Sequence, residues 1–143
     1  MNRVYRWYFH FNALHNMTPD NLEQEHIHSF LVVACMEVKH MDLKEQNACE
    51  QAISAYLQSY RGKYLNELDE FKGMLPTIEN ICEVLYARIC CIAREYHIRL
   101  IHLEVGDSPV AMYAVGEKLL LGSTYREISD ESYQKYKQEL ELK

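Results

Sequence analysis

Two segments near the start of the chain place apolar side chains at every second position. One run is Tyr5, Trp7, Phe9, Phe11 and Ala13, and the other is Phe30, Val32, Ala34, Met36 and Val38. A period of two is typical of β-strands that bury one face. The segment between them contains Asn, Thr-Pro and Asp, which are turn residues. The pattern predicts strands over residues 4–14 and 26–38, paired as an antiparallel hairpin.

The period changes in the middle of the chain, where apolar residues recur every three or four positions. This spacing predicts amphipathic helices over residues 43–60 and 78–96. The link between them contains two glycines and ends at Pro76, and Thr77 is a suitable N-cap for the second helix. The apolar faces are Cys49, Ala52, Ile53, Tyr56, Leu57 and Tyr60 in the first helix, and Ile78, Ile81, Cys82, Leu85, Ile89, Ile92, Ala93 and Tyr96 in the second.

The last third of the chain predicts two more strands, over residues 98–105 and 110–121, around the turn "GDSP". Ser129 or Asp130 caps a short charged helix near the C-terminus. The expected order is β-β-α-α-β-β plus that helix, an α+β fold with a four-stranded antiparallel sheet and two helices on one face. We expect a single domain over residues 1–143, with 128–143 as a helical extension.

Composition narrows the function classes. The formal net charge of −6 disfavours nucleic acid as a partner, because nucleic acid is bound by basic surfaces. The sequence holds no run of roughly 18 apolar residues, so we expect no membrane span. The five cysteines are odd in number and show no C-x-x-C spacing, which favours buried thiols in a reducing cytoplasm.

Three of the seven histidines share the core-facing parity of the first two strands, namely His15, His26 and His28. Residues two apart on a strand lie about 6.5–7 Å apart on one face, so two such imidazoles can converge on one ion. Three neutral histidines would leave a fourth tetrahedral position open, as in catalytic zinc sites. The alternative is that they are polar residues capping the core. The other histidines lack such neighbours, and we expect them to be structural or exposed: His10, His40, His97 and His102.

Several short motifs resemble those of the 6-pyruvoyl- and 6-carboxytetrahydropterin synthases. "FNALHNM" resembles the F-x-A-x-H opening of that family, and "HIHSF" resembles its H-G-H-x-[YF] motif. "KYLNE" is similar to the end of L-D-H-x-Y-L-N, and "PTIENICEVLYARI" to the P-T-x-E-N helix start. The motifs occur in the family's order, and the resemblance covers roughly residues 5–121.

The resemblance implies a tunnelling fold (T-fold), in which trimers, or dimers of trimers, close their sheets into a barrel with active sites between subunits. It also implies that Zn²⁺ is bound by His15, His26 and His28, and that the substrate is a pterin related to dihydroneopterin triphosphate. In that family, zinc polarises oxygens of the substrate's side chain while a base moves protons at the adjacent carbons.

The sequence departs from the family at the positions that handle protons. The catalytic cysteine is replaced by Leu22, and the aspartate and histidine of the relay are replaced by Arg61 and Gly62. The glycine between the zinc histidines is Ile27. The glutamate that anchors the pterin has Asp107 as its nearest counterpart, in a turn about two residues shorter. The usual proton-handling groups are therefore missing, although the metal ligands are present.

A replacement base is available in the segment "DNLEQE". Glu23 and Glu25 closely precede His26, and a divergent branch of the family uses a glutamate near this position to cleave the side chain to 6-hydroxymethyl-dihydropterin. A carboxylate beside a bound substrate can accept a proton when burial raises its pKa. The alternative is a solvated acidic loop. Arg61 and Lys63 would bind a phosphate or carboxylate, or form a solvated basic pair.

Three functions follow as hypotheses. The first is a zinc-dependent carbon–oxygen or carbon–carbon lyase acting on a pterin, with Glu23 or Glu25 as base. The second is an inactive family member that binds zinc and a pterin in a binding or regulatory role. The third is a structural oligomer with vestigial histidines, which retention of all three ligands disfavours. The sequence does not choose among queuosine, folate and biopterin synthesis.

Overall fold

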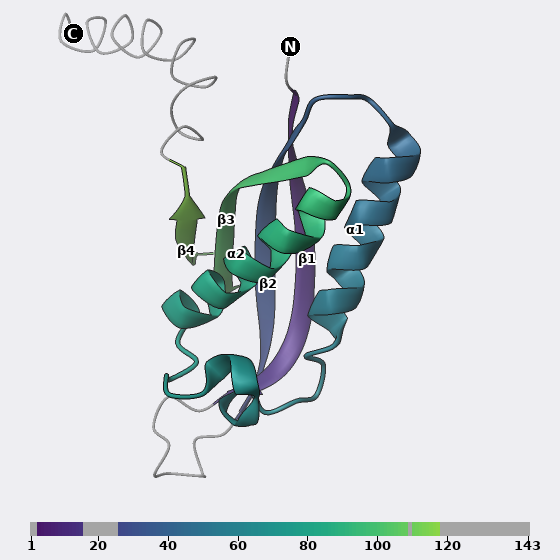
Figure 1. The fold of residues 1–143 in the computed structure, drawn as a ribbon. Coiled ribbons are helices and arrows are strands. Elements are labelled where there is room, and N and C mark those ends of the chain that lie inside the picture. Colours follow the sequence, from purple (N-terminus) through teal and green to yellow (C-terminus); the bar gives the residue numbers. More distant parts are fainter. Residues whose placement is uncertain (1–2, 16–25, 109, 118–143) are drawn as a thin grey trace, which may run out of the picture.

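The computed structural model describes residues 3–15, 26–108 and 110–117 of the 143-residue chain. The elements are β1 (Arg3–His15), β2 (His26–Val38), α1 (Leu43–Gln58), η2 (Leu65–Glu67), η3 (Asp69–Phe71), α2 (Ile78–Glu95), β3 (Ile98–Ser108) and β4 (Ala111–Gly116). The strands β1 and β2 are followed by helix α1, two short 3-10 helices, helix α2 and the strands β3 and β4, which confirms the predicted β-β-α-α-β-β order within the described residues (Figure 1).

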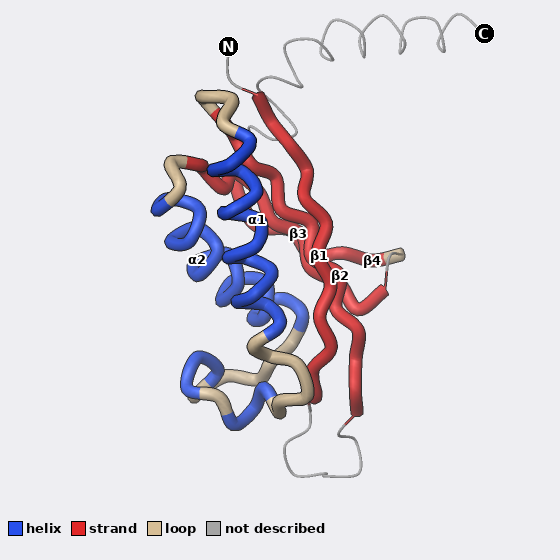
Figure 2. The backbone as a smooth tube through the Cα atoms, turned by 90° about the vertical axis from the view of Figure 1, so that its right-hand side faces the viewer, coloured by secondary structure: helices blue, strands red, loops and turns tan. Residues whose placement is uncertain are grey.

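The four strands form one antiparallel sheet in the order β1-β2-β3-β4. The hairpin pairs along its whole length, from Arg3 opposite Val38 to His15 opposite His26. Both α1 and α2 cover the same face of the sheet, as Figure 2 shows edge-on. This arrangement confirms the predicted α+β fold with two helices on one face.

The core lies between this sheet face and the two helices. Along β1, burial follows the predicted period of two, so that Phe9, Phe11, Ala13 and His15 are buried and the alternate residues are exposed or half-buried. The helices supply the opposite side of the core with residues at the predicted spacing: Cys49, Ile53 and Leu57 from α1, and Ile81, Cys82, Leu85, Ile89 and Ala93 from α2.

A β-bulge in β3 divides the buried strand into two parts. Cys35 pairs with His102 and Met36 pairs with Leu100, which leaves Ile101 as an extra residue. A bulge reverses the parity of the residues beyond it. His102 is therefore turned to the sheet face away from the helices, where its Nε2 lies 3.7 Å from Glu104 Oε1. His102 is buried, and its structural role stays a prediction.

The element boundaries differ from the predicted ones at several ends. Helix α1 ends at Gln58 rather than at residue 60, because the next turn tightens and Tyr60 N–H donates to the Leu57 carbonyl. Strand β3 extends to Ser108, so part of the expected turn is strand. The strand predicted over residues 110–121 corresponds to β4, which ends at Gly116. Residues 118–143, including the expected C-terminal helix, lie outside the described residues.

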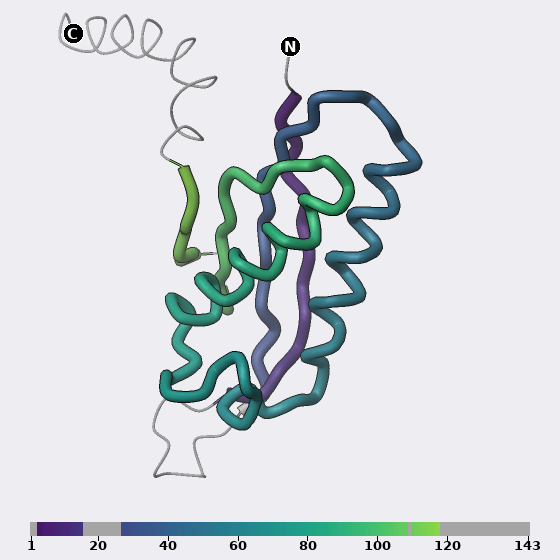
Figure 3. The backbone as a smooth tube through the Cα atoms, in the orientation of Figure 1, coloured from purple at the N-terminus to yellow at the C-terminus, as the bar shows by residue number. Residues whose placement is uncertain are grey.

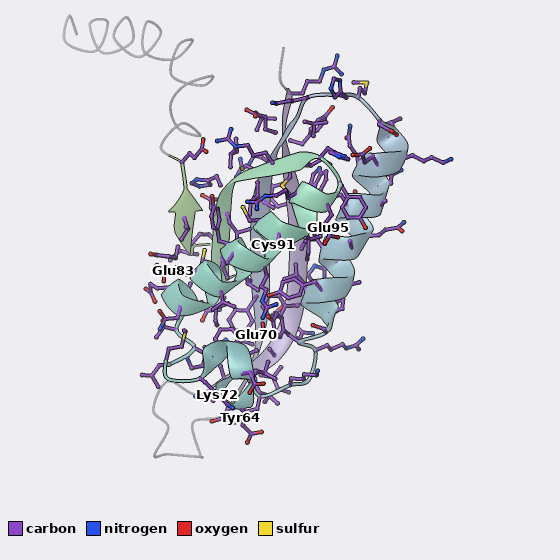
Figure 4. The ribbon with its side chains drawn as sticks, in the orientation of Figure 1. Tyr64, Glu70, Lys72, Glu83, Cys91 and Glu95 are labelled. Atoms are coloured by element: carbon purple, nitrogen blue, oxygen red, sulfur yellow. The ribbon has the colours of Figure 1, made fainter. Side chains whose placement is uncertain are left out.

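The five cysteines are free thiols, as expected. Three of them are buried: Cys35, Cys49 and Cys82. Burial raises the pKa of Cys49 to about 11 and that of Cys82 to about 12, so both stay protonated at neutral pH. The prediction of buried thiols is wrong for Cys91, which is exposed on α2 (Figure 4).

Candidate metal centre

The three predicted metal ligands come together at one end of the hairpin. His15 is the last residue of β1 and His26 is the first residue of β2, and the two are paired directly across the strands. His28 follows two positions later, opposite Ala13. The backbone therefore places the three histidines at neighbouring register positions, because full pairing of the hairpin leaves no slip between the strands.

The imidazole rings of His15 and His28 contact one another, and both lie near the ring of Phe30. Their ring centroids are 4.7 Å apart with an interplanar angle of 83°, and the centroid of Phe30 lies 5.2 Å from that of His15. Phe30 in turn stacks on Phe11. His15 is 0% exposed, so its ring is held by packing before any ligand arrives.

A backbone carbonyl in the segment before α2 determines which ring nitrogen of His15 carries the hydrogen. Its Nδ1 lies 2.9 Å from the carbonyl oxygen of Pro76. A carbonyl only accepts, so Nδ1 carries the hydrogen, and in the neutral ring Nε2 then carries the lone pair. A histidine with Nδ1–H bonded to a carbonyl and Nε2 as the basic atom has the usual arrangement of a metal ligand. The donor chemistry of His15 thus fits zinc.

Asp107 lies beside the second histidine. Its Oδ2 is 3.7 Å from Nδ1 of His28, and the two side chains are 38% and 27% exposed. Asp107 is near the end of β3, so the sheet itself brings this carboxylate to the start of β2. The structure therefore places the residue expected to anchor a pterin next to an expected metal ligand of the same chain.

The segment after α1 is bonded to the end of β1. Leu14 N–H donates to the Lys63 carbonyl at 2.9 Å, and Gly62 N–H donates to the Asn12 carbonyl at 3.3 Å. Figure 3 shows this segment at the end of the sheet where β1 ends, and Figure 4 shows Tyr64 at the same end. Arg61 is exposed in this turn. Gly62, where the resemblance leads one to expect a relay histidine, is thus held near the end of β1 that carries His15.

The other predicted site residues fall outside the described part of the chain. Glu23 and Glu25 lie between residues 15 and 26, outside the described ranges, as does Leu22. Among the described residues no group of three or more histidine, cysteine or carboxylate side chains could hold a metal ion. The side chain of His26 is not among the described ones, so the three-histidine site stays a prediction.

Sequence reasoning missed the part played by the segment before α2. It identified Thr77 as the N-cap, and this is confirmed because Asn80 N–H donates to Thr77 Oγ1 at 3.2 Å. It did not foresee that the carbonyl of Pro76, 61 residues from His15, would be the partner of that histidine. A backbone carbonyl leaves no signature of its own in a sequence. The Thr77 cap marks the start of α2 in the sequence, and it is the one sequence signal for the position of the Pro76 carbonyl.

Comparison with known proteins gives the family. The sequence model of the family described as 6-pyruvoyl tetrahydropterin synthase matches residues 4–118. No protein among those with curated descriptions matches. The described residues contain no helix long and apolar enough to cross a membrane.

Solved structures show the same fold at low sequence identity. The 6-pyruvoyl tetrahydropterin synthase of Caenorhabditis elegans has a TM-score of 0.66 and 14% identity, over 82% of this chain and 97% of that one. An uncharacterized protein from Wolinella succinogenes has a TM-score of 0.57 and 15% identity, over 82% and 99%. The 6-pyruvoyl tetrahydropterin synthase of Plasmodium falciparum has a TM-score of 0.54 and 10% identity, over 81% and 98%.

Proposed function

This chain belongs to the 6-pyruvoyl tetrahydropterin synthase family, and from that premise we propose that it is a zinc-dependent lyase acting on dihydroneopterin triphosphate or a related pterin. The observation that carries the proposal is the hydrogen bond from His15 Nδ1 to Pro76, which prepares Nε2 of this buried ring for a metal. A histidine that only capped the core would not need a second imidazole with its centroid 4.7 Å away.

The residues that would hold zinc are His15, His26 and His28. His15 supports this because its tautomer leaves Nε2 as the basic atom, and His28 supports it because its Nδ1 faces the carboxylate of Asp107. When bound, zinc would supply a Lewis acid that polarises oxygens of the pterin side chain. The rigid packing of His15 on Phe30 lowers the cost of bringing the ligands together.

Proton transfer requires a group outside the family's usual set. Leu22 has no ionisable atom, Gly62 has no side chain, and the guanidinium of Arg61 offers donors but no acceptor, so none of the three can act as a base. We assign the base to Glu23 or Glu25, which precede His26 by three residues and one residue. A carboxylate there can accept a proton from the substrate's side chain if the bound pterin excludes water.

Substrate recognition is assigned to Asp107 and Arg61. The carboxylate of Asp107 is an acceptor suited to the amino and N–H groups of a pterin, and the sheet places it beside His28. Arg61 is exposed in the turn bonded to β1, where a guanidinium can bind a phosphate of the substrate. These assignments put the ring at β3 and the phosphates at the turn after α1.

The assembly proposed for the protein is a trimer or a dimer of trimers in the cytoplasm. In the described residues β1 and β4 are the two edge strands of the sheet. Exposed edges favour pairing with another sheet, and closure into a barrel removes them. The candidate metal centre lies at the end of edge strand β1, so a neighbouring subunit would complete its surroundings.

The activity is tested with zinc-loaded wild-type protein and dihydroneopterin triphosphate, following the pterin product by chromatography. We expect turnover in the wild type and a loss of roughly 100-fold or more in Glu23→Gln or Glu25→Gln, whichever residue is the base. Glu50→Gln, an exposed glutamate on α1, is the matched control and should keep full activity. Unchanged turnover in both glutamate variants would refute the assignment of the base.

A second candidate is an inactive family member that binds zinc and a pterin in a binding or regulatory role. The observation that favours it is the replacement of all three proton-handling residues, by Leu22, Arg61 and Gly62. Under this alternative the same assay gives no product, whereas isothermal titration with a pterin still shows binding. The two candidates therefore differ in turnover and agree in zinc binding.

A further inference from the structure

The segment that leads into α2 is held by three hydrogen bonds. The side-chain amide of Asn80 donates from Nδ2 to the Leu75 carbonyl at 2.8 Å. The backbone N–H of Thr77 donates to the same carbonyl, also at 2.8 Å. Asn80 N–H donates to Thr77 Oγ1, which caps the helix. The Leu75 carbonyl is therefore fixed by two donors, one of them a side chain.

These bonds determine where the Pro76 carbonyl points. The described chain contains no cis peptide bond, and in a trans peptide unit the C=O and the following N–H point in opposite directions. With Thr77 N–H directed at Leu75, the carbonyl of Pro76 is directed away from it, toward Nδ1 of His15. The ring of Pro76 also fixes its own φ, so little freedom remains in this unit.

We propose that Asn80 is a positioning residue for the metal ligand His15, acting through the Leu75 carbonyl and the Pro76–Thr77 peptide unit. The inference rests on the proposed zinc site. Asn80 holds Leu75, Leu75 accepts from Thr77, and the peptide unit thus held accepts the Nδ1 hydrogen of His15. Pro76 and His15 are both buried, so water does not readily substitute for the Pro76 carbonyl.

The identity of residue 80 agrees with this role. It is the third residue of α2, three positions after the N-cap Thr77. A carboxylate at this position would interact favourably with the helix dipole and could complete a capping box. Asn80 instead directs its amide hydrogen back to Leu75. Only a donor can make that bond, so an acid that suits the helix would lose the connection to His15.

Asn80→Asp tests the inference because it keeps the side chain's shape and removes its donor. We expect the zinc dissociation constant, measured by competition with a chromophoric chelator, to rise roughly 10-fold. This is the lower end of the range for direct partners of metal-bound histidines, because Asn80 acts on His15 through the Leu75 carbonyl and the Pro76–Thr77 peptide unit. The added negative charge would by itself favour a cation, so a weaker affinity cannot be attributed to charge. Asn47→Asp, the same change at an exposed position of α1, is the matched control and should bind zinc like the wild type.

A second measurement detects the tautomer of His15 directly, and its first result is obtained on the wild type alone. Protein labelled with ¹⁵N-histidine and loaded with zinc should show His15 protonated at Nδ1 and bound through Nε2. In Asn80→Asp we expect that Nδ1–H signal to broaden or to exchange with solvent faster. Binding through Nδ1 in the wild type would overturn the inference even if the variant fails to fold.

The remaining outcomes separate this inference from the proposed function. If the wild type binds zinc and Asn80→Asp matches it in affinity and in the Nδ1–H signal, the positioning role is wrong and the zinc site stands. If the wild type binds no zinc after loading, the zinc-dependent function is wrong, and the inference that depends on it is wrong as well.

Discussion

Gly62 stands where the family resemblance leads one to expect a relay histidine, and its backbone explains part of that departure. Its φ is +72°, in the left-handed region that glycine adopts without steric cost. Its N–H donates to Asn12, so this conformation joins the turn after α1 to the end of β1. A histidine here would have to adopt the same φ or shift the turn.

Gly62→Ala is expected to lower the free energy of unfolding by about 1 kcal/mol, because alanine is strained at this φ. A Cβ at Gly62 would meet no atom of another segment within 4 Å, so the loss comes from strain against the residue's own backbone and not from packing. Urea denaturation measures it. Gly62→Asn, which tolerates the left-handed region better, should recover part of the loss. Equal stability of the alanine variant and the wild type would show that the turn is not held at this φ.

At the residue scale, the sequence predicted the positions of the histidines but not their partners. The parity of His15 and His28 follows from a period of two, and the structure confirms it along β1. The contact of His15 with Pro76 and that of His28 with Asp107 depend on how distant segments meet in space. Hydrophobic periodicity carries no information about such contacts, so they could not be predicted.

The apolar spacing of α2 determines which face of the helix packs on the sheet and which face is exposed. Cys82 faces the core, with Sγ 3.6 Å from the Leu103 carbonyl, whereas Cys91 is on the outward side with Glu83 and Glu95 (Figure 4). We therefore expect a thiol reagent at pH 8 to label Cys91 in the folded protein and Cys82 only after unfolding. Mass spectrometry of the labelled peptides measures this, and early labelling of Cys82 would contradict the orientation of α2.

The burial of Cys82 makes the free energy of unfolding depend on pH at alkaline values. Burial raises the pKa of Cys82 from 9.0 to about 12, so the folded protein holds this proton more tightly than the unfolded chain does. Its contribution to stability is complete below about pH 9 and is lost as pH rises toward 12. Cys82→Ala should therefore show a shallower loss of stability between pH 9 and pH 11 than the wild type.

The element boundaries were predicted where a local signal exists. The Thr77 cap of α2 is confirmed, since Ser, Thr, Asp and Asn cap helices through their own side chains. The bulge at Ile101 was not predicted, although the run "IRLIHLEV" carries a trace of it. Apolar residues alternate at positions 98 and 100 and then at 103 and 105, and the apolar Ile101 between the two runs hides the change of phase. It is the pairing with β2 that reveals the extra residue.

At the scale of the whole molecule, the sheet is expected to be part of a larger assembly. Its edge strands are β1 and β4, and the described segment after α1 bonds to β1 at Asn12 and Leu14, near one end of that strand. We expect sedimentation equilibrium to give three or six chains per particle at micromolar concentration. A monomer under these conditions would contradict the proposed barrel and leave the edges to be explained in another way.

The central claim is that His15, His26 and His28 bind zinc, and zinc stoichiometry measures it most directly. The protein is loaded with zinc, dialysed and analysed for metal by mass spectrometry, alongside His15→Ala, His28→Ala and the exposed control His40→Ala. We predict one zinc per chain in the wild type and in His40→Ala, and a loss of zinc in the other two. A wild type without zinc, or full occupancy in His15→Ala and His28→Ala, would contradict the account.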